Sequence, residues 1–209
     1  MSFKRVSEAV IRRIPRYYRH LVMLESQGVE RISSERLAKQ MNLNASQVRQ
    51  DFNCFGGFGQ QGYGYNVSTL ISEIKKIMAI DRKHSIIIVG AGNIGHALTN
   101  FPGFNESGFE VKALFDINKE LIGSSVNGRP VLDIKDMDEY IRQNSIDIGV
   151  IAARRTAAQE IADRMCAAGI RGIWNFVPVD LTTSVPIENV HLSESLSTLS
   201  YKIEHGMLD

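Results

Sequence analysis

The stretch Ser85-Ile-Ile-Ile-Val-Gly90-Ala-Gly-Asn-Ile-Gly95 decides the fold of the second half of this chain. Its run of β-branched residues predicts a buried strand, and three glycines follow in the pattern Gly-x-Gly-x-x-Gly. A second apolar run, 109–115, ends in Asp116, about twenty residues after the glycine loop. This order of strand, loop, helix and acid predicts a dinucleotide-binding site.

Each glycine of the loop has a separate predicted role. Gly90 allows a sharp turn after the strand, Gly92 allows the backbone to approach a pyrophosphate, and Gly95 allows the next helix to pack closely on the sheet. The pyrophosphate would bind the N–H groups at the start of that helix. Asp116 would bind the adenosine ribose and repel a 2′-phosphate, which favours NAD over NADP, while Lys119 leaves that choice open. The predicted cofactor contacts from the motif are Gly90, Ala91, Gly92, Asn93, Ile94, Gly95, Asp116 and Lys119.

Strands and helices alternate through the rest of the second half. A strand is expected at 146–152, followed by a helix that Thr156-Ala-Ala-Gln159 would cap and Gly169 would end. Further strands are expected at 172–175 and around 189–192. This alternation predicts an α/β fold, a Rossmann-type doubly wound parallel sheet in residues 81–192.

The last segment, residues 193–209, is expected to form one amphipathic helix. Ser193 would cap it, and an apolar stripe follows on one side: Leu196, Leu199 and Ile203. A short terminal helix is marginally stable alone and needs a surface to pack against. From these residues alone, its own sheet is as good a candidate for that surface as any other.

The formal net charge of +1 hides an asymmetry between the two halves. Residues 1–80 carry 12 Lys and Arg against 6 Asp and Glu, whereas residues 81–209 carry 12 against 17. A basic small domain joined to an acidic one suggests that the first binds a polyanion, although a solvated basic surface would also fit the count. No apolar run approaches the ~20 residues that span a bilayer, so we expect a cytoplasmic protein with no membrane contact.

Residues 1–80 are expected to form three helices. Apolar residues recur at helical spacing after Pro15, which is favoured in the first turn of a helix, and Gly28 would end this helix. A second helix is expected at 35–41, capped by one of the two serines before it. A tight break then separates the second helix from the third.

The third helix would begin at the capping pattern Asn44-Ala-Ser-Gln47 and end near Cys54. Two short helices joined by such a tight turn form a helix-turn-helix, whose second helix enters a major groove. Val48 and Phe52 would face the core. The outward side chains, which suit base edges and phosphates, are Ser46, Gln47, Arg49 and Gln50.

Glycine and aromatic residues dominate the next stretch, Phe55-Gly-Gly-Phe-Gly-Gln-Gln-Gly-Tyr-Gly-Tyr65. Such a run predicts a flat, tight hairpin, the wing of a winged helix. Its tip at Gln60 and Gln61 would reach a minor groove. The predicted DNA contacts are Arg12, Arg16, Ser46, Gln47, Arg49, Gln50, Phe58, Gln60, Gln61 and Gly62.

Four stretches together resemble the Rex family of redox-sensing transcriptional repressors, and the resemblance runs along nearly the whole chain. They are Gln47-Val-Arg-Gln-Asp51 with the wing, the glycine loop, Asn100-Phe-Pro-Gly-Phe104 and Gly169-Ile-Arg-Gly-Ile-Trp-Asn-Phe-Val-Pro178. The resemblance implies an N-terminal winged helix-turn-helix domain, NADH and NAD+ as cofactors, and a homodimer that binds a palindromic operator and releases it when NADH binds. It also implies that the terminal helix crosses to the partner subunit.

The resemblance implies roles for individual residues as well. Ala153 and Arg154 match a loop near the nicotinamide. Arg19 matches an arginine that joins a tyrosine and an aspartate from the two subunits in a polar switch. Phe101 and His191 stand at what look like the positions of that tyrosine and that aspartate.

Two other functions remain open from the residues themselves. A small NAD-dependent oxidoreductase would use the same fold, but no histidine is placed convincingly as an acid or base, so no catalytic residue is assigned. No residues have metal-ligand spacing, so no metal is expected. A coenzyme A or other nucleotide-binding module with no DNA role would also use the loop, because the loop binds a diphosphate rather than the nicotinamide.

Overall fold

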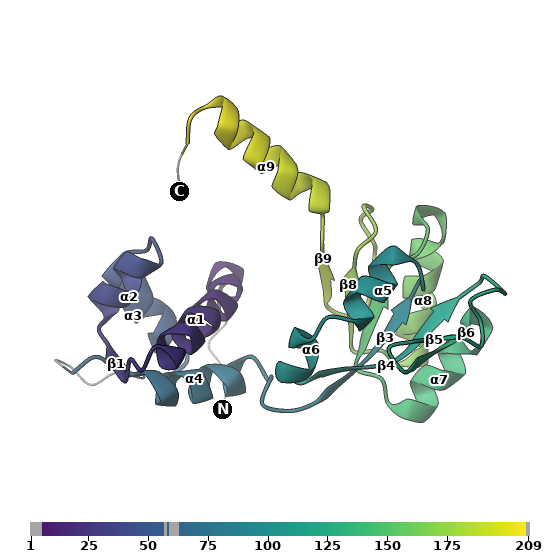
Figure 1. Ribbon diagram of the computed structural model, residues 1–209, viewed down its shortest axis with the longest axis horizontal. Coiled ribbons are helices and arrows are strands. Elements are labelled where there is room, and N and C mark those ends of the chain that lie inside the picture. The colour runs from purple at the N-terminus through teal and green to yellow at the C-terminus, as the bar shows by residue number, and fades with distance from the viewer. Residues whose placement is uncertain (1–5, 57, 59–62, 208–209) are drawn as a thin grey trace. The chain divides into compact units, whose positions relative to one another are not determined.

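The chain divides into two units, Met1–Arg82 and Lys83–Asp209, each with its own hydrophobic core. Figure 1 shows the computed structural model, in which residues 6–56, 58 and 63–207 are described. Along these described ranges, no helix is long and apolar enough to cross a membrane.

Unit 1 is built from helices whose apolar sides meet in one core. Its described elements are α1 (Glu8–Ser26), β1 (Arg31–Ile32), α2 (Ser34–Gln40), α3 (Ala45–Asn53), β2 (Tyr65–Asn66) and α4 (Val67–Ile77). Ser33, Asn44 and Asn66 cap α2, α3 and α4, because each side chain accepts a hydrogen bond from a backbone N–H of the first turn. The expected helix-turn-helix is therefore α2 and α3.

The first helix begins at Glu8, so the expectation of a helix starting at Pro15 is wrong, and Pro15 lies inside α1. An internal proline lacks the N–H that would bond to a carbonyl one turn earlier. Continuous burial offsets this loss, because Ile14 before the proline and Tyr17 after it belong to the same core.

The stretch predicted to form the wing ends in β2, which pairs antiparallel with β1 so that Tyr65 lies opposite Ile32. Gly64 precedes this pairing with φ +71°, and a Cβ there would lie 2.7 Å from the carbonyl oxygen of Ile32. Only glycine fits so close to a neighbouring backbone. The predicted wing tip, Gln60, Gln61 and Gly62, lies outside the described residues.

A hydrogen-bonded cluster joins α1 to α3. Nε and Nη2 of Arg13 donate to the two carboxylate oxygens of Asp51 at 2.7 and 2.8 Å, and the Tyr17 hydroxyl donates to Asp51 at 2.8 Å. The hydrogen bonds to Asp51 raise the pKa of Arg13, while burial and then the bond to Asp51 raise the pKa of Tyr17. Asp51 therefore stays paired inside unit 1 and fixes α3 on α1.

Unit 2 contains one seven-stranded sheet in the order β5-β6-β4-β3-β7-β8-β9. Neighbouring strands are parallel except for the pair of β5 and β6, so the doubly wound parallel sheet is confirmed with one antiparallel edge strand. The strands are β3 (His84–Val89), β4 (Phe109–Asp116), β5 (Ser125–Val126), β6 (Arg129–Asp133), β7 (Ile148–Ile151), β8 (Gly172–Asn175) and β9 (Ile187–Asn189).

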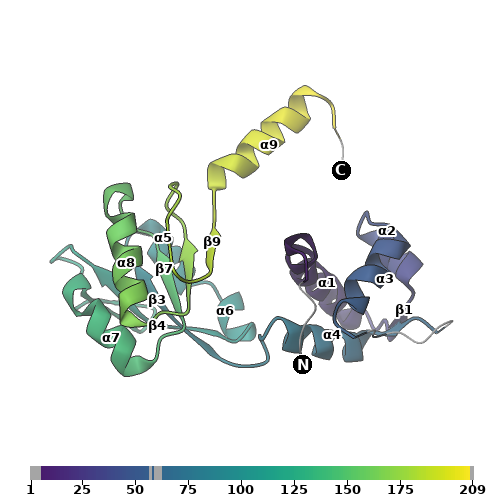
Figure 2. The same ribbon diagram turned by 180° about the vertical axis from the view of Figure 1, so that it is seen from behind.

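Helices cover both faces of this sheet. Figures 1 and 2, seen from opposite sides, show α5 and α6 on one face and α7 and α8 on the other. Alternate residues of β3 face the two layers, since Ile87 belongs to one core and Ile88 to the other. The helices of unit 2 are α5 (Asn93–Thr99), α6 (Gly103–Glu106), α7 (Met137–Asn144), α8 (Ala158–Ala168) and α9 (Leu192–Glu204).

Three expected boundaries in unit 2 are wrong by a few residues. Thr156 does not cap α8, because it lies in a 3-10 turn and Ala157 precedes the α-helix. The last strand is β9, which ends where a strand was expected to begin. Ser193 lies inside α9, whose N-cap is His191 with no side-chain capping bond.

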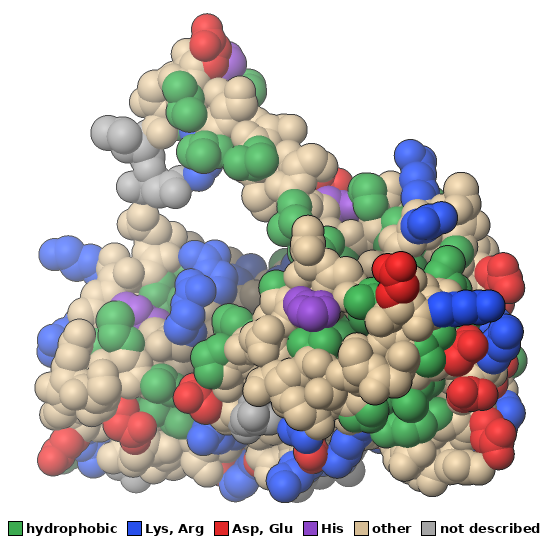
Figure 3. Space-filling model, turned by 45° about the vertical axis from the view of Figure 1, so that its right-hand side comes forward, with side chains coloured by type: hydrophobic (Ala, Val, Ile, Leu, Met, Phe, Trp, Pro, Cys, Tyr) green, Lys and Arg blue, Asp and Glu red, His purple; other side chains and the backbone are tan. Residues whose placement is uncertain are grey.

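Helix α9 leaves the sheet after β9 with its apolar side chains exposed. Figure 3 shows hydrophobic side chains along α9. More than half of the surface of each of these side chains is exposed: Leu192, Leu196, Leu199, Tyr201, Ile203 and Met207. The described residues of unit 2 therefore provide no surface that covers these side chains.

Replacing Asp51 with alanine should destabilise unit 1 by about 3 to 5 kcal/mol, because it leaves the Arg13 guanidinium without its counterion where only 19% of that side chain is exposed. Amide hydrogen exchange in α1 and α3 measures this loss separately from unit 2. Glu8→Ala, which breaks the exposed pair with Arg12, is the control and should cost less than about 1 kcal/mol. Equal exchange in both variants would show that Asp51 does not anchor α3.

Candidate functional site

The chain places strands on both sides of β3, with β4 and β6 toward one edge and β7, β8 and β9 toward the other. In open α/β sheets, ligands bind at such a switch point, outside the carboxyl ends of the strands. A pocket of about 670 Å³ lies there, within the usual size range of small-molecule sites. Its lining comes mainly from the ends of β3, β4 and β7 and from the start of α8.

The three loop glycines differ in what surrounds them. Gly90 has φ +108°, and a Cβ there would overlap the backbone of Ala152 after β7. A Cβ at Gly95 would overlap the carbonyl oxygen of Gly90. A Cβ at Gly92 would meet no atom within 4 Å, and Gly92 lines the pocket. Gly90 and Gly95 therefore allow the loop to fold, whereas Gly92 leaves space for a ligand.

Asp116 lies at the end of β4, and two backbone N–H groups hold its carboxylate. Oδ2 accepts from Ala91 at 2.7 Å and Oδ1 accepts from Asn118 at 2.8 Å. Each oxygen keeps a further lone pair, which suits the hydroxyl groups of a ribose. The bond from Ala91 also ties the glycine loop to β4.

The pocket brings together some of the predicted cofactor residues and not others. Its lining includes Gly90, Gly92, Asp116, Ala153 and Arg154. Ala91 and Gly95 are buried beside it, and Asn93, Ile94 and Lys119 are exposed outside the lining. The lining also includes residues that the sequence analysis missed, among them Ile117, Asn118, Leu121, Ile134 and Ile161. The first two directly follow Asp116 at a strand end, which could have indicated them, whereas Ile134 follows β6, a strand that was not expected.

Helix α3 presents a polar surface of unit 1. Val48 and Phe52 are buried in the core. Of the residues predicted to bind DNA, Ser46, Arg49 and Gln50 are exposed and Gln47 is half-buried. Phe58 is half-buried against the core, with its ring centroid 6.0 Å from that of Phe52. The predicted contacts Arg12 and Arg16 are exposed on one side of α1 together with Arg19.

Arg49 is tied to the start of α2. Its Nη1 donates to the Ser34 hydroxyl and to Oε1 of Glu35, both at 2.9 Å. The pKa of the Glu35 carboxyl is lowered, first by a hydrogen bond from its own backbone N–H and then by the side chains of Ser33 and Ser34. Glu35 is therefore a carboxylate at neutral pH beside the polar surface of α3.

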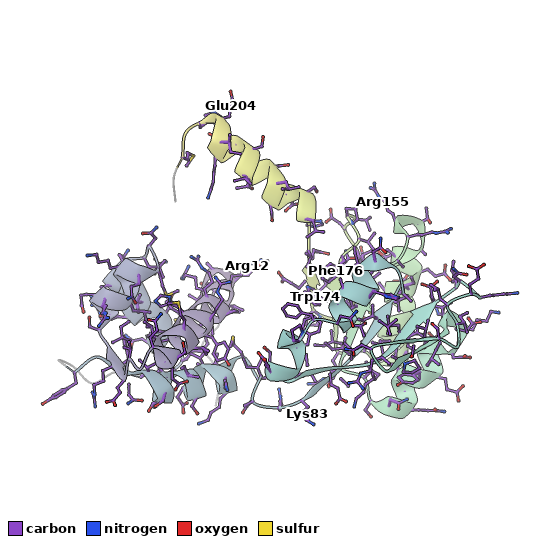
Figure 4. The ribbon with its side chains drawn as sticks, viewed as in Figure 1. Arg12, Lys83, Arg155, Trp174, Phe176 and Glu204 are labelled. Carbon is purple, nitrogen blue, oxygen red and sulfur yellow. The ribbon has the colours of Figure 1, made fainter. Side chains whose placement is uncertain are left out.

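The predicted switch residues are divided between the units. Arg19 belongs to unit 1, whereas Phe101 follows α5 and His191 directly precedes α9 in unit 2. Phe101 packs on Phe104 with ring centroids 5.1 Å apart, at a second, largely apolar pocket of about 550 Å³ that Trp174 also lines. Figure 4 shows Trp174 beside Phe176. A joint role of the three switch residues remains a prediction.

No metal centre is formed by the residues that the structure describes, since no three His, Cys, Asp or Glu side chains are placed to hold an ion.

Two family models match the chain in different units. One described as "Putative DNA-binding protein N-terminus" matches residues 5–53, and one described as "CoA binding domain" matches residues 81–179.

Curated relatives match nearly the full length of this chain. The redox-sensing transcriptional repressor Rex of Clostridioides difficile is 49% identical over 205 residues, covering 97% of this chain and 98% of that protein. The Rex protein of Thermoanaerobacter pseudethanolicus is 50% identical over 206 residues, covering 98% of this chain and 92% of that protein.

Solved structures show the same fold at similar identity. RSP, described as a Rex-family repressor, is known in complex with beta-NAD+ and operator DNA, and that structure matches with a TM-score of 0.93 and 48% identity over 97% of this chain and 94% of its own. Its complex with beta-NADH matches with a TM-score of 0.90 and 45% identity over 97% and 96% of the two chains. This chain therefore belongs to the Rex family of redox-sensing transcriptional repressors.

Proposed function

We propose that this protein is a cytoplasmic transcriptional repressor, not an enzyme, that binds operator DNA and releases it when NADH occupies unit 2. The observation that carries this proposal is the presence, in one chain, of a helix-turn-helix with a polar exposed surface and a dinucleotide pocket at the switch point of the sheet. RSP, nearly half identical over almost the whole chain, supports it because that repressor is described with operator DNA, NAD+ and NADH.

On the cofactor side, the residues of the pocket fit a dinucleotide. Gly92 would leave room for the pyrophosphate, and the first turn of α5 has no side-chain cap to compete with an anion. Asp116 would hold the adenosine ribose, which favours NAD(H) over NADP(H). Arg154, which is exposed and lines the pocket, would lie near the nicotinamide, as the family resemblance implies.

On the DNA side, the protein would act as a homodimer on a palindromic operator. Two copies of α3 would then read two half-sites about one helical turn apart. Helix α9 is the proposed link between subunits, because a contiguous exposed apolar stripe such as the one on this helix is typical of a protein–protein contact. Arg19, Phe101 and His191 are proposed to report the cofactor state across that interface.

The direct test uses a palindromic duplex that this protein selects from a random-sequence pool. Fluorescence anisotropy should show the labelled duplex released by NADH but retained with NAD+ or with coenzyme A. Raising salt should weaken the complex, because phosphate contacts release counterions. Release by coenzyme A but not by NADH would replace the redox-sensing proposal with a coenzyme A-responsive one, and failure to select any duplex would exclude the repressor role.

Gly92→Val should weaken cofactor binding strongly while the protein stays folded, because Gly92 lines the pocket and a Cβ there meets no atom within 4 Å. We expect NADH affinity, measured by calorimetry, to fall by about 100-fold, or about 2.8 kcal/mol. Gly172→Ala is the control, since its Cβ would make an ordinary contact at 3.6 Å away from the pocket lining. Unchanged NADH binding in Gly92→Val would place the pyrophosphate elsewhere.

Leu196→Lys together with Leu199→Lys should weaken the homodimer, because both side chains lie on the exposed apolar stripe of α9. Analytical ultracentrifugation should show dissociation at protein concentrations where the parent is dimeric, and operator affinity should fall with it. Thr198→Lys, about 200° around the same helix from Leu196 and about 100° from Leu199, is the control and should stay dimeric. A double variant that remains dimeric would mean that α9 does not join the subunits.

A further inference from the structure

We propose that Glu35 is a positioning residue for DNA reading, which holds the Arg49 guanidinium so that its free edge contacts a guanine. The proposal rests on the repressor function proposed above and names a residue that sets its specificity. Glu35 is not itself expected to contact a base, because a carboxylate and DNA phosphates repel each other.

The geometry is a closed triangle of three side chains. Nη1 of Arg49 donates to Oε1 of Glu35 and to the hydroxyl of Ser34, and that hydroxyl donates in turn to Oε1 of Glu35 at 3.1 Å. Ser34 is buried at the start of α2, so the triangle has a fixed base. Because Ser34 is buried, neither Arg49 nor Glu35 can rotate away without breaking its hydrogen bond to the Ser34 hydroxyl.

The rest of the guanidinium is available for DNA. Among the described residues, no hydrogen-bond partner is found for Nε or Nη2 of Arg49, and 49% of its side chain is exposed. These two groups form one edge of the planar fork, and such an edge matches the O6 and N7 acceptors of guanine. A held arginine loses less conformational freedom on binding than a mobile one does.

Stability alone explains this pair poorly. The Arg49 and Glu35 side chains are 49% and 69% exposed, and exposed ion pairs contribute little to folding. A carboxylate next to the DNA-reading helix also weakens attraction to any duplex. The effect of Glu35 is therefore selective. Its charge lowers the affinity for every duplex, and the orientation that it gives to the Arg49 guanidinium recovers affinity only where a guanine accepts from that guanidinium.

The test is a double-mutant cycle in the full-length protein with Glu35→Ala, Arg49→Ala and both together. Affinities are measured for the selected operator and for a scrambled duplex of the same length. Glu35→Ala should bind the scrambled duplex more tightly and lower the operator preference roughly tenfold. In the Arg49→Ala background, the same change should leave the preference unaltered within about twofold. Glu25→Ala, which removes an exposed carboxylate from α1, is the matched control and should keep the parent preference.

Glu35→Gln serves as the conservative variant, because its side-chain oxygen can still accept from Arg49, and it should recover part of the preference. A parent-like NADH affinity and a parent-like thermal transition in each variant would exclude misfolding as the cause of any change in preference. An unchanged preference in Glu35→Ala, or an equal loss in the Arg49→Ala background, overturns the positioning role while leaving the repressor function intact. A parent protein with no preference for any duplex would overturn both.

Discussion

Gly90 approaches the backbone of Ala152 so closely that no side chain fits between the end of β3 and the end of β7. The cofactor pocket depends on this approach. It brings the loop to the switch point of the sheet, where Gly95 lets α5 pack against the same loop and Ala91 donates to Asp116. Backbone groups thus hold both the glycine loop and Asp116, which are the proposed phosphate-binding and ribose-binding parts of the site, and few side chains would need to be ordered when a ligand binds.

In unit 1, a polar cluster holds α3 in place on α1. Asp51 accepts from Arg13 and Tyr17 and so fixes the side of α3 that is turned inward, while the opposite side stays polar and exposed. A second set of polar contacts, from Arg49 to α2, acts on the outward side. The proposed DNA-reading surface is therefore held from both sides of one short helix, which by itself would be only marginally stable.

Local signals in the sequence predicted much of this. The glycine loop, the acid at the end of β4 and the capping pattern at Asn44 each act within one turn or strand, so they identified the dinucleotide fold and α3. Helix α4 was missed although its signals are local, because Asn66 caps it and apolar residues follow at helical spacing. Strand β6 is short and lacks such a signal, and the proline rule misplaced the start of α1 because burial carries that helix through Pro15. The pairing of Arg49 with Glu35 joins residues 14 apart and has no local signature.

The central claim is that one dimer couples the cofactor pocket to the DNA surface, and thermodynamic linkage requires such coupling to be reciprocal. The most direct measurement is the NADH affinity of the free protein and of the protein saturated with operator. Operator should weaken NADH binding by the same factor, about 5- to 150-fold, by which NADH weakens operator binding. Equal NADH affinities in the two states would contradict it.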